Sequence, residues 1–364
     1  MSEREFVDFA YKTGAGRYIQ EPCALDLLGA EVLRLGKKAF ILAGPNGHAA
    51  AGALAQASLE REGVPFLLEI SSQAASYEGA RRYAQQAAEA GCDVVVGLGG
   101  GRIMDAAKAV AASGGLPVVE VPTSIATCAA FTPLSVMYGP EGGVCGTWRY
   151  EREVDAVVVD GRVMASQPAR LIAAGIMDSL AKILEISHGR QGLDMETESA
   201  QRYCAYRYAL VNGEILERFG EEAYRDASAG RAGNAIERVV FANLALTGVV
   251  SSLTRGFHQT ALAHRFYDGM RGVFRERVSA FLHGELVSIG LLMQAEFNGS
   301  SEQVESLRRH MRAMGMPCSV GELGISRDDA ALDELRESIL ASEFVGEDED
   351  ERARFEKAFR VTLG

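Results

Sequence analysis

The first 160 residues alternate between two kinds of segment, and this alternation constrains the fold more than any other feature of the chain. Short apolar runs bounded by Gly or Pro are separated by longer segments rich in Ala, Glu and Gln. The apolar runs lie at residues 38–43, 64–70, 93–97, 118–121 and 154–159, and the helix-length segments at 48–63, 76–90 and 102–112. Strands without polar alternation are typical of a parallel sheet covered on both faces. The pattern therefore predicts a doubly wound α/β domain.

After about Pro168 the β-branched runs disappear and segments with helical spacing take over. They lie at residues 169–188, 197–220, 232–255, 282–297 and 302–314. A chain of 364 residues is longer than one hydrophobic core usually organises. We therefore predict an α/β domain at residues 1–165 and an all-α domain at residues 166–364. A cleft between two such domains is the usual place for a cofactor and a substrate to meet.

Charge and cysteine content exclude several classes of function. The formal net charge is −12, which disfavours nucleic acid and anionic membrane surfaces as partners. The longest apolar stretches, such as Val94–Leu98, are too short to span a bilayer. Six scattered cysteines without CxxC spacing indicate reduced thiols, and the N-terminus has no secretory signal pattern. We expect a cytoplasmic protein that acts on a small molecule and assembles as a homo-oligomer.

A glycine-rich loop follows the third predicted strand. It reads Gly97-Leu98-Gly99-Gly100-Gly101-Arg102 and opens a predicted helix. Glycines let a backbone approach a phosphate closely, and a helix N-terminus offers unpaired N–H groups and a positive dipole end. The alternative is a tight turn without a ligand. A standard Rossmann fingerprint follows the first strand, so this loop is a pyrophosphate loop of another kind.

A second loop, at Val121–Cys128, follows the next predicted strand and is rich in hydroxyl groups (VPTSIATC). Such a loop at the carboxyl end of a strand can line a nucleotide cleft. Taken alone it is a weak signal, because Ser and Thr in loops mostly cap helices. Two such loops on adjacent strands are better evidence for a nucleotide site than either one.

One carboxylate and two histidines in the helical half form a candidate metal site. His264 and His283 are nineteen residues apart, which suits two helices joined by a loop. Asp178 lies in an apolar helix, where a carboxylate must be paired, protonated or bound to a metal. Two imidazoles and one carboxylate leave a coordination position open, as a catalytic zinc or iron(II) site requires. The alternatives are ordinary surface or core histidines, and an ion pair of Asp178 with Lys182 at i,i+4.

In combination, four motifs resemble a known family. GLGGGRIMDAAKA, VPTSIATCAAFTPLSVMY, VVVD…PARLIAAGIMDSLAK and AH…FLHGELV are similar, in order and spacing, to the glycerol dehydrogenase branch of the metal-dependent (iron-type) alcohol dehydrogenases. The resemblance covers roughly residues 15–300. It implies a dehydroquinate-synthase-like fold, NAD(P)(H) as cofactor and one divalent metal, with zinc favoured over iron.

The resemblance also assigns residues to the two sites. Asp178, His264 and His283 would be the metal ligands. The pyrophosphate loop would be formed by Gly99, Gly100, Gly101, Asp105 and Lys108. The nicotinamide side of the cofactor site would be lined by Thr123, Thr127, Thr132, Leu134 and Tyr138.

Three positions depart from the glycerol dehydrogenase pattern. Cys128 stands where those enzymes carry an aspartate beside the polyol, which removes an acceptor and a negative charge and matches the hydroxycarboxylate dehydrogenase type. The alternative for Cys128 is a small buried filler. Gly44 replaces an aspartate that repels the 2′-phosphate of NADP, so NADP(H) should be tolerated. Tyr267 replaces a histidine, so Tyr267 or His258 would have to relay a proton.

The predicted activity is therefore the interconversion of a small 2-hydroxy acid, or a polyol or other alcohol, and its carbonyl form by a metal-dependent NAD(P)(H) oxidoreductase. Arg149, Arg265 and Lys182 are candidate partners for a substrate carboxylate. The alternatives are a glycerol or 1,2-diol dehydrogenase, a carbocyclic lyase of the dehydroquinate synthase type, and a non-catalytic homologue that keeps the fold.

Overall fold

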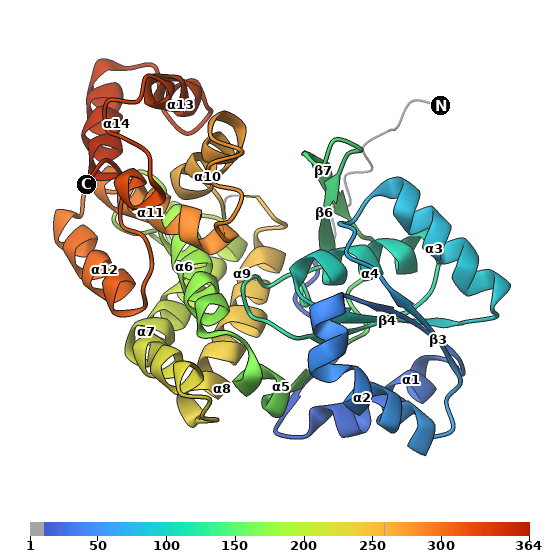
Figure 1. Cartoon of the computed structure of the whole chain (residues 1–364). Helices are drawn as coiled ribbons and strands as arrows, with labels where there is room; N and C mark the ends of the chain where they lie inside the picture. The colour runs from blue at the N-terminus through green and yellow to red at the C-terminus, as the bar shows by residue number, and fades with distance from the viewer. Residues whose placement is uncertain (1–10, 258) are drawn as a thin grey trace. The chain divides into compact units, whose positions relative to one another are not determined.

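The computed structural model describes residues 11–257 and 259–364, and the chain divides into two compact units, Met1–Gln167 and Pro168–Gly364. The first is an α/β unit and the second is a helical unit (Figure 1). The predicted fold class is confirmed. His258, one of the two candidates for a proton relay, lies outside the described residues.

The α/β unit contains a six-stranded sheet with the order β1-β8-β5-β4-β2-β3, and every neighbouring pair in it is parallel. Its strands are β1 (Tyr18–Glu21), β2 (Ala39–Ala43), β3 (Phe66–Ile70), β4 (Val94–Gly99), β5 (Val118–Pro122) and β8 (Ala156–Asp160). Strands β2, β4, β5 and β8 are buried throughout, as their continuous apolar runs predicted, whereas β3 is an edge strand with partly exposed residues.

Helices cover both faces of this sheet. Figure 1 shows α3 and α4 on one face, and α1 and α2 on the other. The helical segments of the unit are η1 (Ala24–Leu27), α1 (Leu28–Leu35), α2 (Pro45–Arg61), α3 (Tyr77–Glu89), α4 (Gly101–Gly114) and α5 (Gly161–Ser166). A two-stranded antiparallel hairpin, β6 (Leu134–Tyr138) and β7 (Val144–Arg149), stands apart from the sheet and was not predicted.

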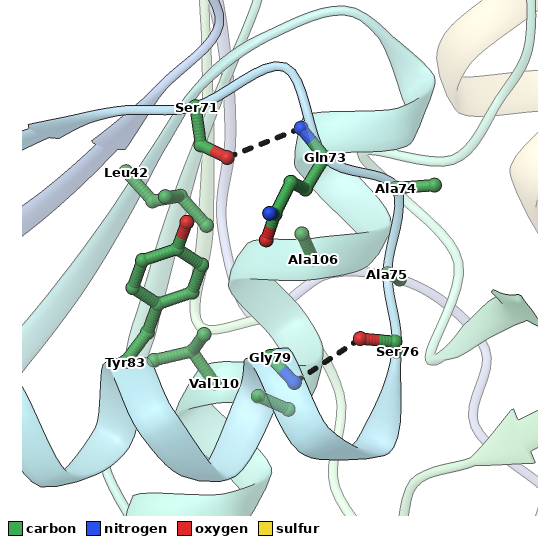
Figure 2. A pocket seen from close by; sticks show the side chains of 11 residues that line it. Leu42, Ser71, Gln73, Ala74, Ala75, Ser76, Gly79, Tyr83, Ala106 and Val110 are labelled. Carbon is green, nitrogen blue, oxygen red and sulfur yellow. Dashed lines mark hydrogen bonds between the residues drawn. The ribbon is translucent and has the colours of Figure 1, made fainter. Parts of the chain in front are cut away.

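The segment before α3 shows how side chains end a loop and start a helix. Ser76 Oγ accepts from the Gly79 N–H (3.1 Å) as the N-cap of α3, and Ser71 Oγ accepts from the Gln73 N–H (3.1 Å) (Figure 2). These residues and Tyr83 line a cavity of about 10 Å³. A cavity of this size holds about one water molecule, so it is not a nucleotide site.

The helical unit packs around α11 (His283–Phe297), in which every residue from Gly284 to Phe297 is buried. A helix that is buried on all sides is typical of the centre of a domain. The other helical segments are α6 (Ala169–Glu185), α7 (Ala200–Ser228), α8 (Asn234–Phe241), the π-helical turn η2 (Ala242–Leu246), α9 (Thr247–Leu253), α10 (Leu262–Val273), α12 (Ser301–Ala313), η3 (Val320–Leu323), α13 (Ala331–Leu340) and α14 (Glu349–Val361).

One run in this unit differs from the sequence expectation about membranes. By length and composition, the helical run Asn234–Leu253 could cross a bilayer. Polar residues interrupt the run, so it contains no uninterrupted apolar stretch of that length. Because 67% of its most apolar window is buried inside the protein, the run has the character of a core helix. It was predicted as one helix, and the structure interrupts it with the π-helical turn at Ala242–Leu246.

Candidate metal centre and cofactor loop

Asp178 is the centre of the candidate metal site and lies in the middle of α6, where its side chain is 1% exposed. Its two carboxylate oxygens have different partners. Oδ2 accepts from Lys182 Nζ (2.6 Å), the i,i+4 ion pair that the sequence offered as an alternative. Oδ1 lies 3.2 Å from His264 Nε2 and 3.1 Å from His283 Nε2. The ion pair and the histidine cluster therefore exist together.

The two histidines come from two helices that pack against α6. His264 lies in the first turn of α10 and His283 is the first residue of α11. Their side chains are 13% and 30% exposed, so both are largely covered but remain accessible in part. The three ligand atoms lie within 4.8 Å of one another. The structure thus brings together the three residues that the sequence analysis selected.

Gly284 lets α11 begin this close to Asp178. A Cβ atom at Gly284 would lie 1.9 Å from the carbonyl oxygen of Ala174, one turn before Asp178 on α6. Such an approach between two backbones excludes every side chain, even that of alanine. Glycine at this position therefore sets where the imidazole of His283 lies.

Two further carboxylates that the sequence did not reveal support this site: Glu185 bonds to His264 directly, and Glu285 fixes the start of the helix that carries His283. Glu185 Oε2 lies 2.6 Å from His264 Nδ1. Glu285 accepts from the Leu282 N–H at the start of α11 (2.8 Å) and forms two 2.6 Å bonds with Arg170 of α6. Glu185 lies between the apolar residues Leu184 and Ile186, which indicates that it needs a partner but not which one. Its partners, and Arg170 as the partner of Glu285, are distant in sequence, so no local pattern identifies them.

The charges of the site shift the pKa values of its members. Burial alone would raise the pKa of Asp178, but the Lys182 ammonium and the two imidazoles outweigh burial and hold this pKa well below its usual range. Burial opposes the charging of His264, yet Glu185 and Asp178 raise its pKa to about 9. Burial, aided by the charges of His264 and Lys182, lowers the pKa of His283.

The donor set fits a divalent cation. Bond lengths of 2.0–2.1 Å in a tetrahedral site place neighbouring ligand atoms roughly 3.3 Å apart, close to the 3.1–3.2 Å between Asp178 Oδ1 and the two histidine nitrogens. Imidazole and carboxylate are ligands that zinc and iron(II) accept.

The glycine loop of the α/β unit connects β4 to α4. Gly100 is the N-cap of α4 without a side-chain bond, so backbone N–H groups are presented at this helix N-terminus. Neighbouring segments approach the loop closely. A Cβ atom at Gly101 would lie 2.6 Å from Thr127 Oγ1, and one at Gly47 would lie 2.6 Å from Gly99 Cα. The two loops that the sequence associated with the cofactor therefore lie against each other.

Asp105 and Lys108 lie on α4 and hold the segment that leads into the hairpin. Lys108 Nζ donates to the carbonyl oxygens of Ala129 (2.6 Å), Thr132 (3.0 Å) and Leu134, and pairs with Asp105 Oδ1 (3.1 Å). Both side chains are buried. They therefore fix the chain between Ala129 and Leu134 on α4, the helix that the glycine loop opens.

The remaining predicted cofactor residues lie in the hydroxyl-rich loop and the segment after it, in strand β6, and at the start of α2. The Thr123 N–H donates to the Gly99 carbonyl (2.9 Å), and Thr132 is buried. Leu134 and Tyr138 are the half-buried ends of β6. Gly44 is the N-cap of α2 with φ −77° and ψ 150°, a conformation open to any residue, and a Cβ atom there would lie 3.0 Å from Ile103 Cγ1. Cys128 is 6% exposed.

The candidate partners for a substrate have different surroundings. Lys182 is paired with Asp178, and Arg265 donates to the Ser338 carbonyl (2.9 Å). Arg149 lines a cavity of about 450 Å³ in the α/β unit. Tyr267, a candidate for the proton relay, lies edge-to-face with the His283 ring, with 4.2 Å between the ring centroids. Of the described candidates, Lys182 and Tyr267 therefore lie next to the three-residue cluster.

Known proteins resemble this chain in sequence and in fold. A family model of iron-containing alcohol dehydrogenases matches residues 15–161. Glycolaldehyde reductase of Halobacterium salinarum is 31% identical over 280 residues, which are 76% of this chain and 73% of that protein. Hydroxycarboxylate dehydrogenase A of Escherichia coli is 32% identical over 256 residues, 68% of each chain.

The crystal structure of a probable glycerol dehydrogenase from Sinorhizobium meliloti is also similar. It has 27% sequence identity and a TM-score of 0.81, and the match covers 97% of this chain and 99% of that one. Sequence and structure therefore agree that the chain belongs to the iron-containing alcohol dehydrogenase family, in its glycerol-dehydrogenase-like group, and is an oxidoreductase.

Proposed function

We propose that this protein is a metal-dependent, NAD(P)(H)-linked dehydrogenase that interconverts a small 2-hydroxy acid and its 2-oxo acid. The observation that carries the proposal is the convergence of Asp178, His264 and His283, with their ligand atoms within 4.8 Å of one another. In this proposal the residues up to about 165 bind the nucleotide, and the residues after it bind the metal and the substrate.

The chain's own residues would hold the two groups that carry the chemistry. Asp178, His264 and His283 would hold a divalent cation, with zinc favoured, that would supply a Lewis acid for the substrate oxygen, and a bound nicotinamide cofactor would supply or accept the hydride. One aspartate and two neutral histidines would leave a net charge of about +1 around a divalent ion, which favours a substrate that carries a carboxylate. The backbone N–H groups at the N-terminus of α4 would bind the pyrophosphate.

Two substitutions support the choice of substrate and cofactor. Cys128 occupies the position where the glycerol dehydrogenase pattern has an aspartate, so a negative charge that would repel a 2-oxo acid is missing. Gly44 likewise lacks a carboxylate that would repel the 2′-phosphate of NADP(H). A glycerol or 1,2-diol dehydrogenase is the second candidate, favoured by the similarity to the Sinorhizobium protein.

The test is the oxidation of NADPH and NADH by the full chain, with zinc or iron(II) added, against 2-oxo acids, aldehydes and dihydroxyacetone. We expect the highest kcat/KM with a 2-oxo acid and turnover with both nucleotides. A marked preference for dihydroxyacetone would support the second candidate. No metal-stimulated turnover on any carbonyl compound would contradict both.

We also propose that the protein works in a reducing cytoplasm and assembles as a homo-oligomer. The six cysteines form no disulfide, and Tyr208 and Val211 of α7 are 47% and 49% exposed, three residues apart on the helix. Exposed apolar side chains that lie side by side can belong to a contact surface. Light scattering coupled to size-exclusion chromatography measures the assembly directly, and a monomer would contradict this part of the proposal.

A further inference from the structure

We propose that Glu185 is a positioning residue that determines which nitrogen of His264 faces the cation. The inference rests on the proposed function, because it gives Glu185 a role in presenting a metal ligand. It concerns a residue outside the three-ligand cluster, on the last turn of α6, with a side chain that is 0% exposed.

The Glu185 carboxylate accepts three hydrogen bonds from the start of α10. Oε1 accepts from the backbone N–H of Ala261 (2.6 Å) and of His264 (2.9 Å), and Oε2 accepts from the His264 ring at Nδ1 (2.6 Å). Ala261 is the N-cap of α10 and has no side chain that could cap the helix. One carboxylate from α6 therefore fixes the backbone of this first turn and the orientation of its imidazole.

The bond to Nδ1 selects one tautomer of His264. A carboxylate can only accept, so Nδ1 must keep its proton, and in the neutral ring the lone pair is then on Nε2. Nε2 is the nitrogen that faces Asp178 Oδ1 at 3.2 Å. Histidines that bind metals commonly donate their other ring N–H to a carboxylate, which fixes the ring and makes it a stronger base.

The substitution Glu185→Gln distinguishes a role of Glu185 in positioning the His264 ring from a role in packing. In Glu185→Gln the amide oxygen can keep the two backbone bonds, but the amide NH₂ then faces Nδ1 and donates to it. The neutral imidazole would carry its proton on Nε2, where the lone pair is needed. The variant keeps the size of the side chain and reverses one hydrogen bond.

The measurement is the Zn²⁺ affinity of the metal-free full chain, determined by competition with a chelator. From the usual effect of such supporting carboxylates we expect Glu185→Gln to bind Zn²⁺ about 10- to 100-fold more weakly, with an unchanged circular dichroism spectrum. The matched control is Glu296→Gln. Glu296 is also buried in this unit (7% exposed), but it contacts Ser301 and Lys357. The control should bind Zn²⁺ like the wild type.

If Glu185→Gln does not fold, a second measurement on the wild-type chain tests which nitrogen of His264 binds the cation. In the wild-type chain labelled with ¹⁵N-histidine and loaded with Zn²⁺, His264 should show a slowly exchanging proton on Nδ1 and metal coupling at Nε2. A folded Glu185→Gln variant with wild-type affinity, or a His264 that binds through Nδ1, would overturn the inference. Wild-type protein that binds no Zn²⁺ would instead contradict the proposed function, and the inference with it.

Discussion

The α/β unit forms its candidate cofactor site from backbone, whereas the helical unit forms its candidate metal site from side chains. At the glycine loop the groups offered to a ligand are N–H groups, and the Lys108 side chain on the same helix is bonded to the Ala129 carbonyl. At the metal site three side chains converge, and each has a further partner or a close backbone contact that fixes it. Atoms added near the glycine loop should therefore impair nucleotide binding, and the loss of a ligand side chain should impair metal binding.

The largest effect should follow the removal of a histidine. His264→Ala or His283→Ala should lower kcat/KM at least about 1000-fold, because metal-ion catalysis supplies several kcal/mol of transition-state stabilisation. Binding of the nucleotide, followed by its fluorescence, should change little in the same variants. If His264→Ala kept near-wild-type activity in metal-free buffer, the metal site would have no role in the reaction.

Gly284→Ala should have the next largest effect, although it removes nothing. The new Cβ would lie 1.9 Å from the Ala174 carbonyl oxygen, so the start of α11 must move away from α6 and take His283 with it. A displacement of about 1 Å at a reacting group can cost about 100-fold in kcat/KM. The control is Gly272→Ala on α10, where a Cβ meets nothing within 4 Å and kcat/KM should be unchanged. Equal activities for the two variants would show that the close approach does not position His283.

The two sites should also differ in their response to pH. Nε2 of His264 must lose a proton before it can bind a cation, and the pKa of this histidine in the metal-free protein is raised to about 9. Protons therefore compete with the metal, and the apparent metal affinity should rise about tenfold per pH unit from about pH 7 to about pH 9. Nucleotide affinity should stay nearly constant over the same range. A flat metal affinity, measured by competition with a chelator of known pH dependence, would contradict this assignment.

Gly47→Ala should impair the cofactor site and spare the metal site. The added methyl group would meet Gly99 Cα at 2.6 Å and the Leu98 carbonyl at 2.7 Å, and so would push the start of α2 away from the glycine loop. Overpacking of this kind costs about 1–3 kcal/mol, so the Kd for the nucleotide should rise roughly tenfold. Gly139→Ala, whose nearest contact would be at 3.7 Å, is the matched control in the same unit. Unchanged nucleotide binding in Gly47→Ala would be evidence against a backbone site here.

Gly44→Asp should give the smallest effect and concerns nucleotide choice alone. The backbone at Gly44 permits any residue, and Ile103 has to shift by only a few tenths of an ångström to admit the side chain. The new carboxylate should repel a 2′-phosphate through solvent by about 1 kcal/mol, which lowers the preference for NADPH over NADH about fivefold. The ratio of the two kcat/KM values measures this. A ratio that does not move would place the 2′ position away from Gly44.

The elements that were best predicted from the sequence are the strands that are buried on both faces of the sheet. Strands β2, β4, β5 and β8 have apolar runs because they are covered on both faces. The sequence analysis missed β1 and the β6–β7 hairpin because their residues are partly exposed and carry no such run. It placed His264 on a helix without giving that helix bounds, and it missed helices α13 and α14, in which polar residues obscure the periodic apolar face.

The same limit holds at the candidate site. Asp178, His264 and His283 were selected by residue type and by the family resemblance. Glu185 was not, because its partners, Ala261 and His264, lie 76 and 79 residues further along the chain. The one signal in the sequence is a glutamate between the apolar residues Leu184 and Ile186. A carboxylate in such a setting needs a partner, but only the folded structure shows which one.

The most direct measurement is the metal content of the purified, reloaded protein, by mass spectrometry of the metal, for the wild type and for Asp178→Asn. The account predicts one divalent ion per wild-type chain and loss of that ion in the variant, with Glu296→Gln retaining it. Equal stoichiometry and affinity in the wild type and in Asp178→Asn would contradict the assignment of this cluster as the metal centre.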